Sequence, residues 1–267
     1  MTTDPDGRRH TPPPVRGDHF VQSLERGLVI LRAFSRERPA MTLSEVARST
    51  GLSRAAARRF LLTLCDLGYV RTDDRMFTLT PRSLDLGFAY LSSAGLPEIA
   101  QEHLERLGAE LGESTSLSVL DGGEVVYVVR VPAGRIVATP ISIGTRLPAY
   151  VTAMGRVLLA GLPDSALNAY LQHLDPQPLT EHTVRSPGAL RTEVLRVREQ
   201  GWALVDRELA DGLRAVAVPV RGRGGRVLAA ANVSAHADRT PLERIRTELL
   251  GPLTAAAAGI EADLARP

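Results

Sequence analysis

Three arginines in one short stretch have the residue type and spacing of a DNA contact surface. Arg54 and Arg58 lie one helical turn apart, and Arg59 follows directly. The planar fork of a guanidinium group matches both the O6/N7 edge of guanine and the phosphate oxygens. Ala55 leaves room for close approach or for a thymine methyl group. Together with the preceding serine, these positions are the first candidate DNA contacts: Ser53, Arg54, Ala55, Arg58 and Arg59.

The residues around these arginines predict a helix-turn-helix that would present them. Thr42 or Ser44 can cap a first helix over residues 43–48, Gly51 tolerates the positive φ that the turn requires, and Ser53 can cap the second helix. On a helical wheel the arginines point away from an apolar face expected at Ala57, Phe60, Leu64 and Leu67. The alternative is an ordinary amphipathic helix pair whose arginines are only solvated.

The flanking segments favour the DNA-reading interpretation. Residues 21–31 predict a helix that packs behind the pair, and β-prone runs at 69–71 and 76–79 predict a hairpin, or wing, with a basic tip. This hairpin adds Arg71 and Arg75 to the candidate DNA contacts. Residues 21–80 contain ten arginines and six acidic residues, a net charge of +4, whereas the whole chain carries +2. Basicity is therefore concentrated in this region.

Composition bounds the other properties. With 267 residues, of which 44% are hydrophobic, the chain can form two modest domains or one small and one large domain. No apolar run approaches a membrane span, and the first twenty residues lack the apolar core of a secretion signal, so we expect a cytoplasmic protein without membrane contact. The single cysteine, Cys65, excludes an intramolecular disulfide, and packing is a better explanation for it than redox sensing.

No catalytic constellation can be assembled from the sequence. The six histidines show no metal-ligand spacing, and Ser116, Ser118 and Ser234 do not lie in a Gly-x-Ser-x-Gly elbow. The glycine-rich stretch 221–226 joins two predicted strands and opens no helix, so it predicts a turn rather than a phosphate loop. We therefore expect no enzyme, no cofactor and no metal site.

The remaining pattern predicts an α+β protein with a mostly antiparallel sheet. We expect a disordered tail over residues 1–18, a DNA-binding domain over 19–80, a linker helix within 81–95 that breaks at residues 92–95, and a second domain over 96–267. Strands are expected at 114–120, 125–131, near Ile141, and at 202–205, 215–220 and 227–234. Helices are expected at 97–111, 152–160, 164–173, 187–200 and 241–264.

Over about residues 21–264 the sequence resembles the IclR family of bacterial transcription regulators. The resemblance is carried by Leu67-Gly68-Tyr69-Val70, by Gly144-Thr145-Arg146-Leu147-Pro148-Ala149-Tyr150, by Met154-Gly155-Arg156-Val157-Leu158-Leu159-Ala160, and by Gly201-Trp202-Ala203-Leu204-Val205-Asp206 with Glu208 and Gly212-Leu213-Arg214. Within the family it is most similar to the subgroup that controls the protocatechuate branch of aromatic breakdown, the β-ketoadipate pathway.

This resemblance implies a winged helix-turn-helix domain, a linker helix and a GAF- or profilin-like effector domain with a six-stranded antiparallel sheet. It also implies a homodimer, or a dimer of dimers, on a palindromic operator in double-stranded DNA. A lone small reading domain covers little DNA, so a two-fold partner that adds a second recognition helix fits this expectation.

A small carboxylate effector is expected at the start of the helix near Thr152, because the free N–H groups of a helix start favour an anion. Arg146 and Arg214 could add a charged fork, although Arg146 could instead pair with Asp206 or Glu208, and Met154 could only fill the core. Family members place the pocket against this helix and the facing strands. The matching positions here are Ala153, Met154, Gly155, Asp206, Ala215, Asn232 and Ser234.

The function expected from the sequence is a ligand-responsive DNA-binding regulator of aromatic-acid catabolism genes. One alternative is a regulator of another small-carboxylate operon. A more distant alternative is an architectural DNA-binding protein that responds to no ligand.

Overall fold

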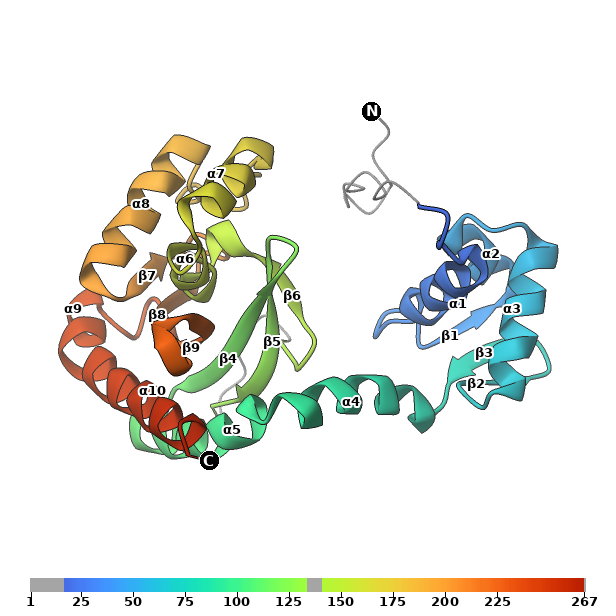
Figure 1. The fold of residues 1–267 in the computed structure, drawn as a ribbon, viewed down its shortest axis with the longest axis horizontal. Helices are drawn as coiled ribbons and strands as arrows, with labels where there is room; N and C mark the ends of the chain where they lie inside the picture. Colours follow the sequence, from blue (N-terminus) through green and yellow to red (C-terminus); the bar gives the residue numbers. More distant parts are fainter. Residues whose placement is uncertain (1–16, 134–140, 267) are drawn as a thin grey trace. The chain divides into compact units, whose positions relative to one another are not determined.

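The computed structural model describes residues 17–133 and 141–266, which form two compact units that meet between Ala89 and Tyr90 in the chain (Figure 1). Each unit has its own hydrophobic core. Residues 1–16, most of the tail that was expected to be disordered, lie outside the described residues.

The N-terminal unit contains the expected helix-turn-helix, built from α2 (Leu43–Thr50) and α3 (Arg54–Asp66), with α1 (Gln22–Ala33) beside them. Thr42 and Glu45 form a reciprocal capping box: Thr42 Oγ1 accepts from the N–H of Glu45, and Glu45 Oε2 accepts from the N–H of Thr42. Gly51 ends α2 in the left-handed conformation, with φ of 68°. Ser53 caps α3 by accepting from the N–H of Ala56 at 3.2 Å.

The buried face of α3 differs from the expected one by part of a turn. Ala57, Leu61 and Leu64 are buried in a core shared with α1 and α2, whereas Phe60 is only half-buried and Leu67 is 52% exposed. The expectation for Leu67 was wrong because this residue is the C-cap, where the chain leaves the helix. The arginine face of α3 nevertheless points outward as predicted.

The wing consists of β2 (Val70–Asp73) and β3 (Met76–Leu79), as predicted. A third strand, β1 (Ala40–Thr42), was not predicted and pairs antiparallel with β3, so that the sheet order is β1-β3-β2. Three residues give too little alternation to be read as a strand, and the partner that stabilises β1 is more than 30 residues away in the chain.

The linker begins with a 3₁₀ turn, Pro81–Ser83, and continues as α4 (Leu84–Ala94). The expected break over residues 92–95 is shorter than predicted. The helix runs through Ala94, and Gly95 alone, with φ of 60°, separates it from α5 (Leu96–Leu111). A positive φ is easily adopted by glycine, which explains why the chain changes direction at this residue.

The C-terminal unit is built on a six-stranded antiparallel sheet of order β6-β5-β4-β9-β8-β7. Its strands are β4 (Ser114–Asp121), β5 (Glu124–Val131), β6 (Arg146–Pro148), β7 (Ala203–Asp206), β8 (Leu213–Arg221) and β9 (Val227–His236). The strand expected near Ile141 was wrong: a turn at residues 142–145, with Gly144 at φ of 85°, precedes the true edge strand β6.

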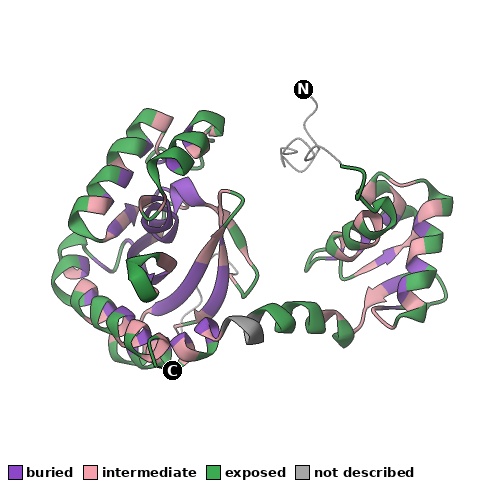
Figure 2. Ribbon diagram, in the orientation of Figure 1, coloured by how far each residue is buried: buried purple, intermediate pink, exposed green. Residues whose placement is uncertain are grey.

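Two helical layers cover the sheet. On one face lie α5 and α10 (Leu250–Leu264), which follows α9 (Leu242–Arg244) and a π-helical turn at Ile245–Leu249. On the other face lies α6 (Ala153–Ala160), backed by α7 (Asp164–His173) and α8 (Pro187–Gln200). Figure 2 shows that α6 and most of the strands are buried between the more exposed outer helices. Polar residues on the α6 face of the sheet therefore lie in the interior.

Among the described residues, no helix has both the length and the apolar character needed to cross a bilayer.

Candidate nucleic-acid interface and small-molecule cavity

The outward face of α3 presents an uninterrupted group of cations. Arg54, Ala55, Arg58 and Arg59 are all exposed, and Ser53 at the helix start is exposed as well. No described carboxylate forms an ion pair with Arg54, Arg58 or Arg59. Three guanidinium groups on one capped helix can therefore contact phosphates and base edges without first breaking an internal ion pair.

The wing adds two arginines of different character. Arg71 Nε donates to Thr78 Oγ1 across the hairpin at 3.1 Å, which orients the side chain along the strand pair. Arg75 is exposed in the turn after Asp74, which adopts a positive φ of 51°. Asp73 and Asp74 lie beside it, so the tip that was expected to be basic carries charges of both signs.

In the C-terminal unit, a small cavity lies between the start of α6 and the sheet. Its volume is about 20 Å³, which is room for about one water molecule. It is lined by Tyr127, Val151, Thr152, Ala153, Met154, Val205, Leu209, Leu213, Ala215, Asn232 and Ser234. Five of the nine expected effector residues are therefore brought together here: Ala153, Met154, Ala215, Asn232 and Ser234.

Gly155, Asp206 and Arg214 support this cavity instead of lining it. A Cβ on Gly155 would lie 2.1 Å from the carbonyl oxygen of Ala149, so only glycine lets α6 approach that turn. Arg214 is buried, with its Nε bound to Asp206 Oδ1 at 2.7 Å and its Nη1 bound to the Ala237 carbonyl at 3.2 Å. Its charge is therefore already neutralised by Asp206.

Arg146 lies at the edge strand β6 and is not part of the cavity lining. It binds Asp121 Oδ2 and Glu124 Oε2, each at 2.7 Å, and these two carboxylates hold the pKa of its guanidinium above the ordinary value. The alternative expectation that it pairs with Asp206 or Glu208 was wrong, because the turn between β4 and β5 supplies both partners.

The start of α6 is less open to an anion than its sequence suggested. Thr152 Oγ1 caps the helix by accepting from the N–H of Gly155 at 3.0 Å, so one of the first N–H groups already has a partner. The cavity nevertheless contains other polar groups, and these come from the sheet.

A row of polar side chains forms the sheet side of the cavity region. Ser114, Ser116 and Ser118 alternate along β4, all fully buried, and face the same layer as Asn232 and Ser234 on β9. Ser118 Oγ contacts Met154 Sδ at 3.2 Å, and Asn232 Nδ2 donates to Ser234 Oγ at 2.9 Å. The every-second-residue serine pattern of β4 is a sequence signal for a polar face that the sequence analysis did not use.

Strand β5 contributes two residues that the sequence analysis missed. Tyr127 lines the cavity, and burial raises the pKa of its hydroxyl to about 12, so it stays neutral at physiological pH. Arg130 lies opposite Ser116 in the strand register and donates from Nη1 to Ser116 Oγ at 2.9 Å. Burial lowers the pKa of the Arg130 guanidinium, and the group is charged nonetheless.

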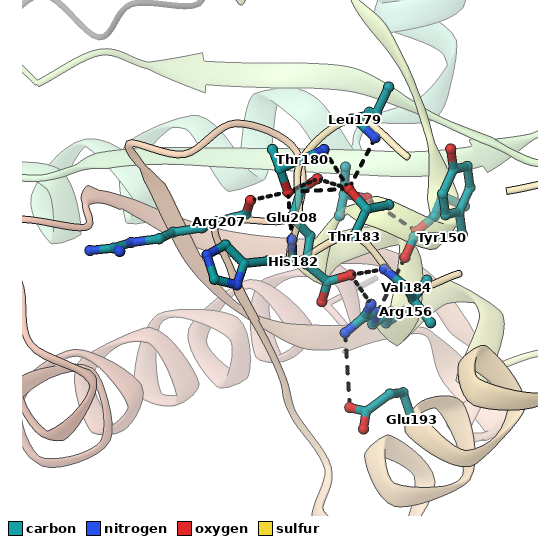
Figure 3. A network of polar contacts seen from close by, with 12 residues as sticks. Tyr150, Arg156, Leu179, Thr180, His182, Thr183, Val184, Glu193, Arg207 and Glu208 are labelled. Atoms are coloured by element: carbon teal, nitrogen blue, oxygen red, sulfur yellow. Dashed lines mark hydrogen bonds and ion pairs between the residues drawn. The ribbon is translucent and has the colours of Figure 1, made fainter. Parts of the chain in front are cut away.

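A buried polar network holds one wall of the cavity (Figure 3). Glu208 accepts from Arg156 Nη2 at 2.6 Å and from the N–H of Val184 at 3.0 Å, while its carbonyl accepts from Thr183 Oγ1 at 2.7 Å. Arg156, on α6, is only 3% exposed. Because Leu209 follows Glu208 directly, this ion pair ties the wall residue to the helix that carries Met154.

Within the described parts of the chain, no cluster of three or more histidine, cysteine, aspartate or glutamate side chains has the arrangement of a metal site.

Comparison with known proteins agrees with both halves of this geometry. The helix-turn-helix domain of IclR matches residues 23–74, and the C-terminal domain of the bacterial transcriptional regulator IclR matches residues 88–262. The Pca regulon regulatory protein of Pseudomonas putida is 41% identical over 238 residues, which are 89% of this chain and 82% of that protein. The p-hydroxybenzoate hydroxylase transcriptional activator of Acinetobacter baylyi is 35% identical, over 90% and 91% of the two chains.

Solved structures agree over nearly the whole length. A putative transcriptional regulator from Rhodococcus sp. RHA1 is 53% identical with a TM-score of 0.84, covering 92% of this chain and 99% of that one. An IclR homolog from Microbacterium hydrocarbonoxydans, complexed with 4-hydroxybenzoate, is 26% identical with a TM-score of 0.81, covering 91% and 98%. The matched proteins are transcriptional regulators and not enzymes. The chain therefore belongs to the IclR family of bacterial transcriptional regulators.

Proposed function

We propose that this chain is a ligand-responsive DNA-binding regulator of genes for aromatic-acid breakdown, in the protocatechuate and β-ketoadipate branch. The observation that carries the proposal is the exposed face of α3, where Arg54, Arg58 and Arg59 have no described ion-pair partner. The pathway assignment is supported by the names of two relatives, a Pca regulon regulator and an activator of p-hydroxybenzoate hydroxylase.

We assign DNA reading to residues 19–80, the link to residues 81–95, and effector binding and oligomerisation to residues 96–267. The DNA contacts in this proposal come from the recognition helix and the wing. They are Ser53, Arg54, Ala55, Arg58, Arg59, Arg71 and Arg75. A regulator of chromosomal genes works in the cytoplasm, and we place the protein there.

We propose that the effector is a small carboxylate that binds at the cavity lined by Met154, Asn232 and Ser234. The apolar part of the lining suits a ring or short chain, whereas the amide and hydroxyl groups can orient polar substituents. The related Microbacterium protein was crystallised with 4-hydroxybenzoate, which combines a ring with a carboxylate.

We further propose that the protein acts as a homodimer, or a dimer of dimers, on a palindromic operator. Large apolar side chains are exposed on α1 and α4, among them Leu24 at 63%, Leu28 at 46%, Leu84 at 72% and Leu86 at 51%. A second copy would bury such residues and add a second recognition helix for the other operator half. Sedimentation of the full chain with and without operator tests this assembly.

DNA selection from a random pool, using the full-length protein, tests the function. We expect the enriched sequences to be inverted repeats and to be bound with steep salt dependence. Operator affinity is then measured with protocatechuate, 4-hydroxybenzoate, β-ketoadipate and glyoxylate. A shift with glyoxylate alone would favour another small-carboxylate operon, and no shift with any acid would favour an architectural protein.

A further inference from the structure

Two buried polar atoms on the α6 face of the sheet have no hydrogen-bond partner among the described residues. One is the donor Arg130 Nε on β5, and the other is the acceptor Asn232 Oδ1 on β9. An unpaired buried polar group costs free energy, and natural proteins keep such groups where they serve another purpose. Each atom therefore needs an explanation, and their chemistry is complementary: one donates and one accepts.

The sheet register places the two residues on either side of the same serine. Ser116 on β4 lies opposite Arg130 on β5 and opposite Asn232 on β9. Two strands separated by a third lie roughly 10 Å apart, so one small molecule can reach both side chains. The orientation of the Asn232 amide follows from its own bond, because Nδ2 donates to Ser234 Oγ at 2.9 Å and Oδ1 is left over.

Arg130 differs from the other inward-facing arginines of this unit. Arg156 and Arg214 are paired with Glu208 and Asp206, whereas Arg130 has a neutral partner, Ser116, and no ion pair with a described carboxylate. A half-buried guanidinium without a counter-charge is a strong binding group for a carboxylate, through charge-assisted hydrogen bonds. Tyr127, which lines the cavity, is close enough to Arg130 to influence its charge.

The remaining walls are apolar, with Val151, Met154, Val205, Leu209 and Leu213 around the two polar ends. A ligand that satisfies all of these surroundings has an anionic end, an apolar body and a hydroxyl donor at the far end. We propose that Arg130 and Asn232 bind the opposite ends of a hydroxylated aromatic acid, Arg130 its carboxylate and Asn232 its ring hydroxyl. This assignment deepens the proposed function, on which it rests, by naming the effector class.

Ligand analogues test the assignment on the unaltered full-length chain by calorimetry. The probes are 4-hydroxybenzoate, protocatechuate, benzoate, the methyl ester of 4-hydroxybenzoate, and β-ketoadipate, a dicarboxylate without a hydroxyl group. We expect the two hydroxybenzoates to bind at least about ten-fold more tightly than the other three, because each of those leaves one polar atom unpaired. Equal affinity for benzoate or the ester, no binding of either hydroxybenzoate, or a preference for β-ketoadipate would overturn the assignment.

Variants then assign the two ends. Arg130→Gln is expected to weaken 4-hydroxybenzoate about ten-fold or more and to leave the ester unaffected, while Arg130→Lys keeps the charge and restores part of the affinity. Asn232→Ala is expected to remove the preference for 4-hydroxybenzoate over benzoate. Arg146→Gln is the matched control, since Arg146 is paired at the sheet edge away from the cavity. Folded Arg130 and Asn232 variants that retain the full preference would refute the assignment.

The inference and the proposed function fail in different ways. A chain that selects inverted repeats but does not distinguish the analogues refutes the ligand assignment alone. A chain that distinguishes the analogues but selects no DNA sequence refutes the proposed function and leaves the ligand assignment standing. If Asn232→Ala unfolds, Asn232→Ser keeps a polar group, and the analogue series on the unaltered chain still decides the question.

Discussion

The two units of this protein use arginine in opposite ways. On α3, three guanidinium groups are exposed and none has a described carboxylate partner, whereas Arg146, Arg156 and Arg214 of the C-terminal unit are each bound to at least one. An unpaired exposed arginine adds little to folding and is available to a polyanion. A paired arginine holds the fold together and is not. The partner of each arginine, and not the residue type, therefore decides which arginines can bind a ligand.

Breaking the most buried pair gives the largest expected effect. Arg156→Met leaves the Glu208 carboxylate in the interior without its cation, which is expected to cost about 3 to 5 kcal/mol of unfolding free energy. Chemical denaturation monitored by circular dichroism measures this loss. A stability within 1 kcal/mol of the unaltered chain would show that Arg156 does not stabilise the fold as its partner suggests.

Removing the unpaired arginines tests the other side of the comparison. Arg54→Ala and Arg58→Ala are each expected to cost about 1 to 3 kcal/mol of operator binding if they contact bases, with no loss of folding stability. A phosphate contact would instead weaken all sequences alike and reduce the salt dependence. Operator affinity measured by fluorescence anisotropy at several salt concentrations separates these outcomes, and a double variant with unchanged affinity would contradict the proposed contact surface.

Arg146 gives an intermediate case, because it is paired but lies at the surface. Solvent screens such pairs, so Arg146→Gln is expected to lower stability by about 0 to 1 kcal/mol and to leave acid binding unchanged. Thermal unfolding with and without 4-hydroxybenzoate measures both quantities. Loss of ligand binding in this variant, with the fold intact, would move the effector site toward β6.

The smallest effect concerns an acid in the N-terminal unit that is held by a backbone group and not by an arginine. The N–H and hydroxyl of Thr42 lower the pKa of Glu45. Its contribution to stability is therefore complete above the ordinary carboxyl pKa of about 4.3 and is lost as the pH falls through the lowered folded value. We expect Glu45→Gln to flatten the acid side of the stability profile, and an identical profile in both proteins would argue against the capping contact.

The helix-turn-helix could be predicted from the sequence because its signals are local. Thr42 and Glu45, Gly51 and Ser53 lie within twelve consecutive residues, and each specifies a cap or a turn by its own chemistry. The membership of Met154, Asn232 and Ser234 in the cavity lining came from the family resemblance. Their common placement requires the pairing of strands that lie more than 100 residues apart in the chain.

The remainder could not be predicted because it depends on register and on partners. A bulge between Leu117 and Ser118 shifts the pairing of β4 with β5, and this pairing decides that Arg130 faces Ser116. The role of Gly155 in letting α6 approach Ala149 is a tertiary contact without any local signal. Arg146 and Arg214 were grouped as a possible fork because sequence shows charges but not the carboxylates that occupy them.

The size of the cavity has a consequence for how an effector would be detected. A space of about 20 Å³ cannot hold a benzene ring, so an effector enters only when the lining residues move apart. The apparent dissociation constant then equals the intrinsic one divided by the fraction of molecules that are open. Affinity thus reports two separable quantities, and a wall residue such as Leu209 can set the sensitivity of the regulator without contacting either polar end of the ligand. Related proteins with identical binding groups could in this way respond at different effector concentrations.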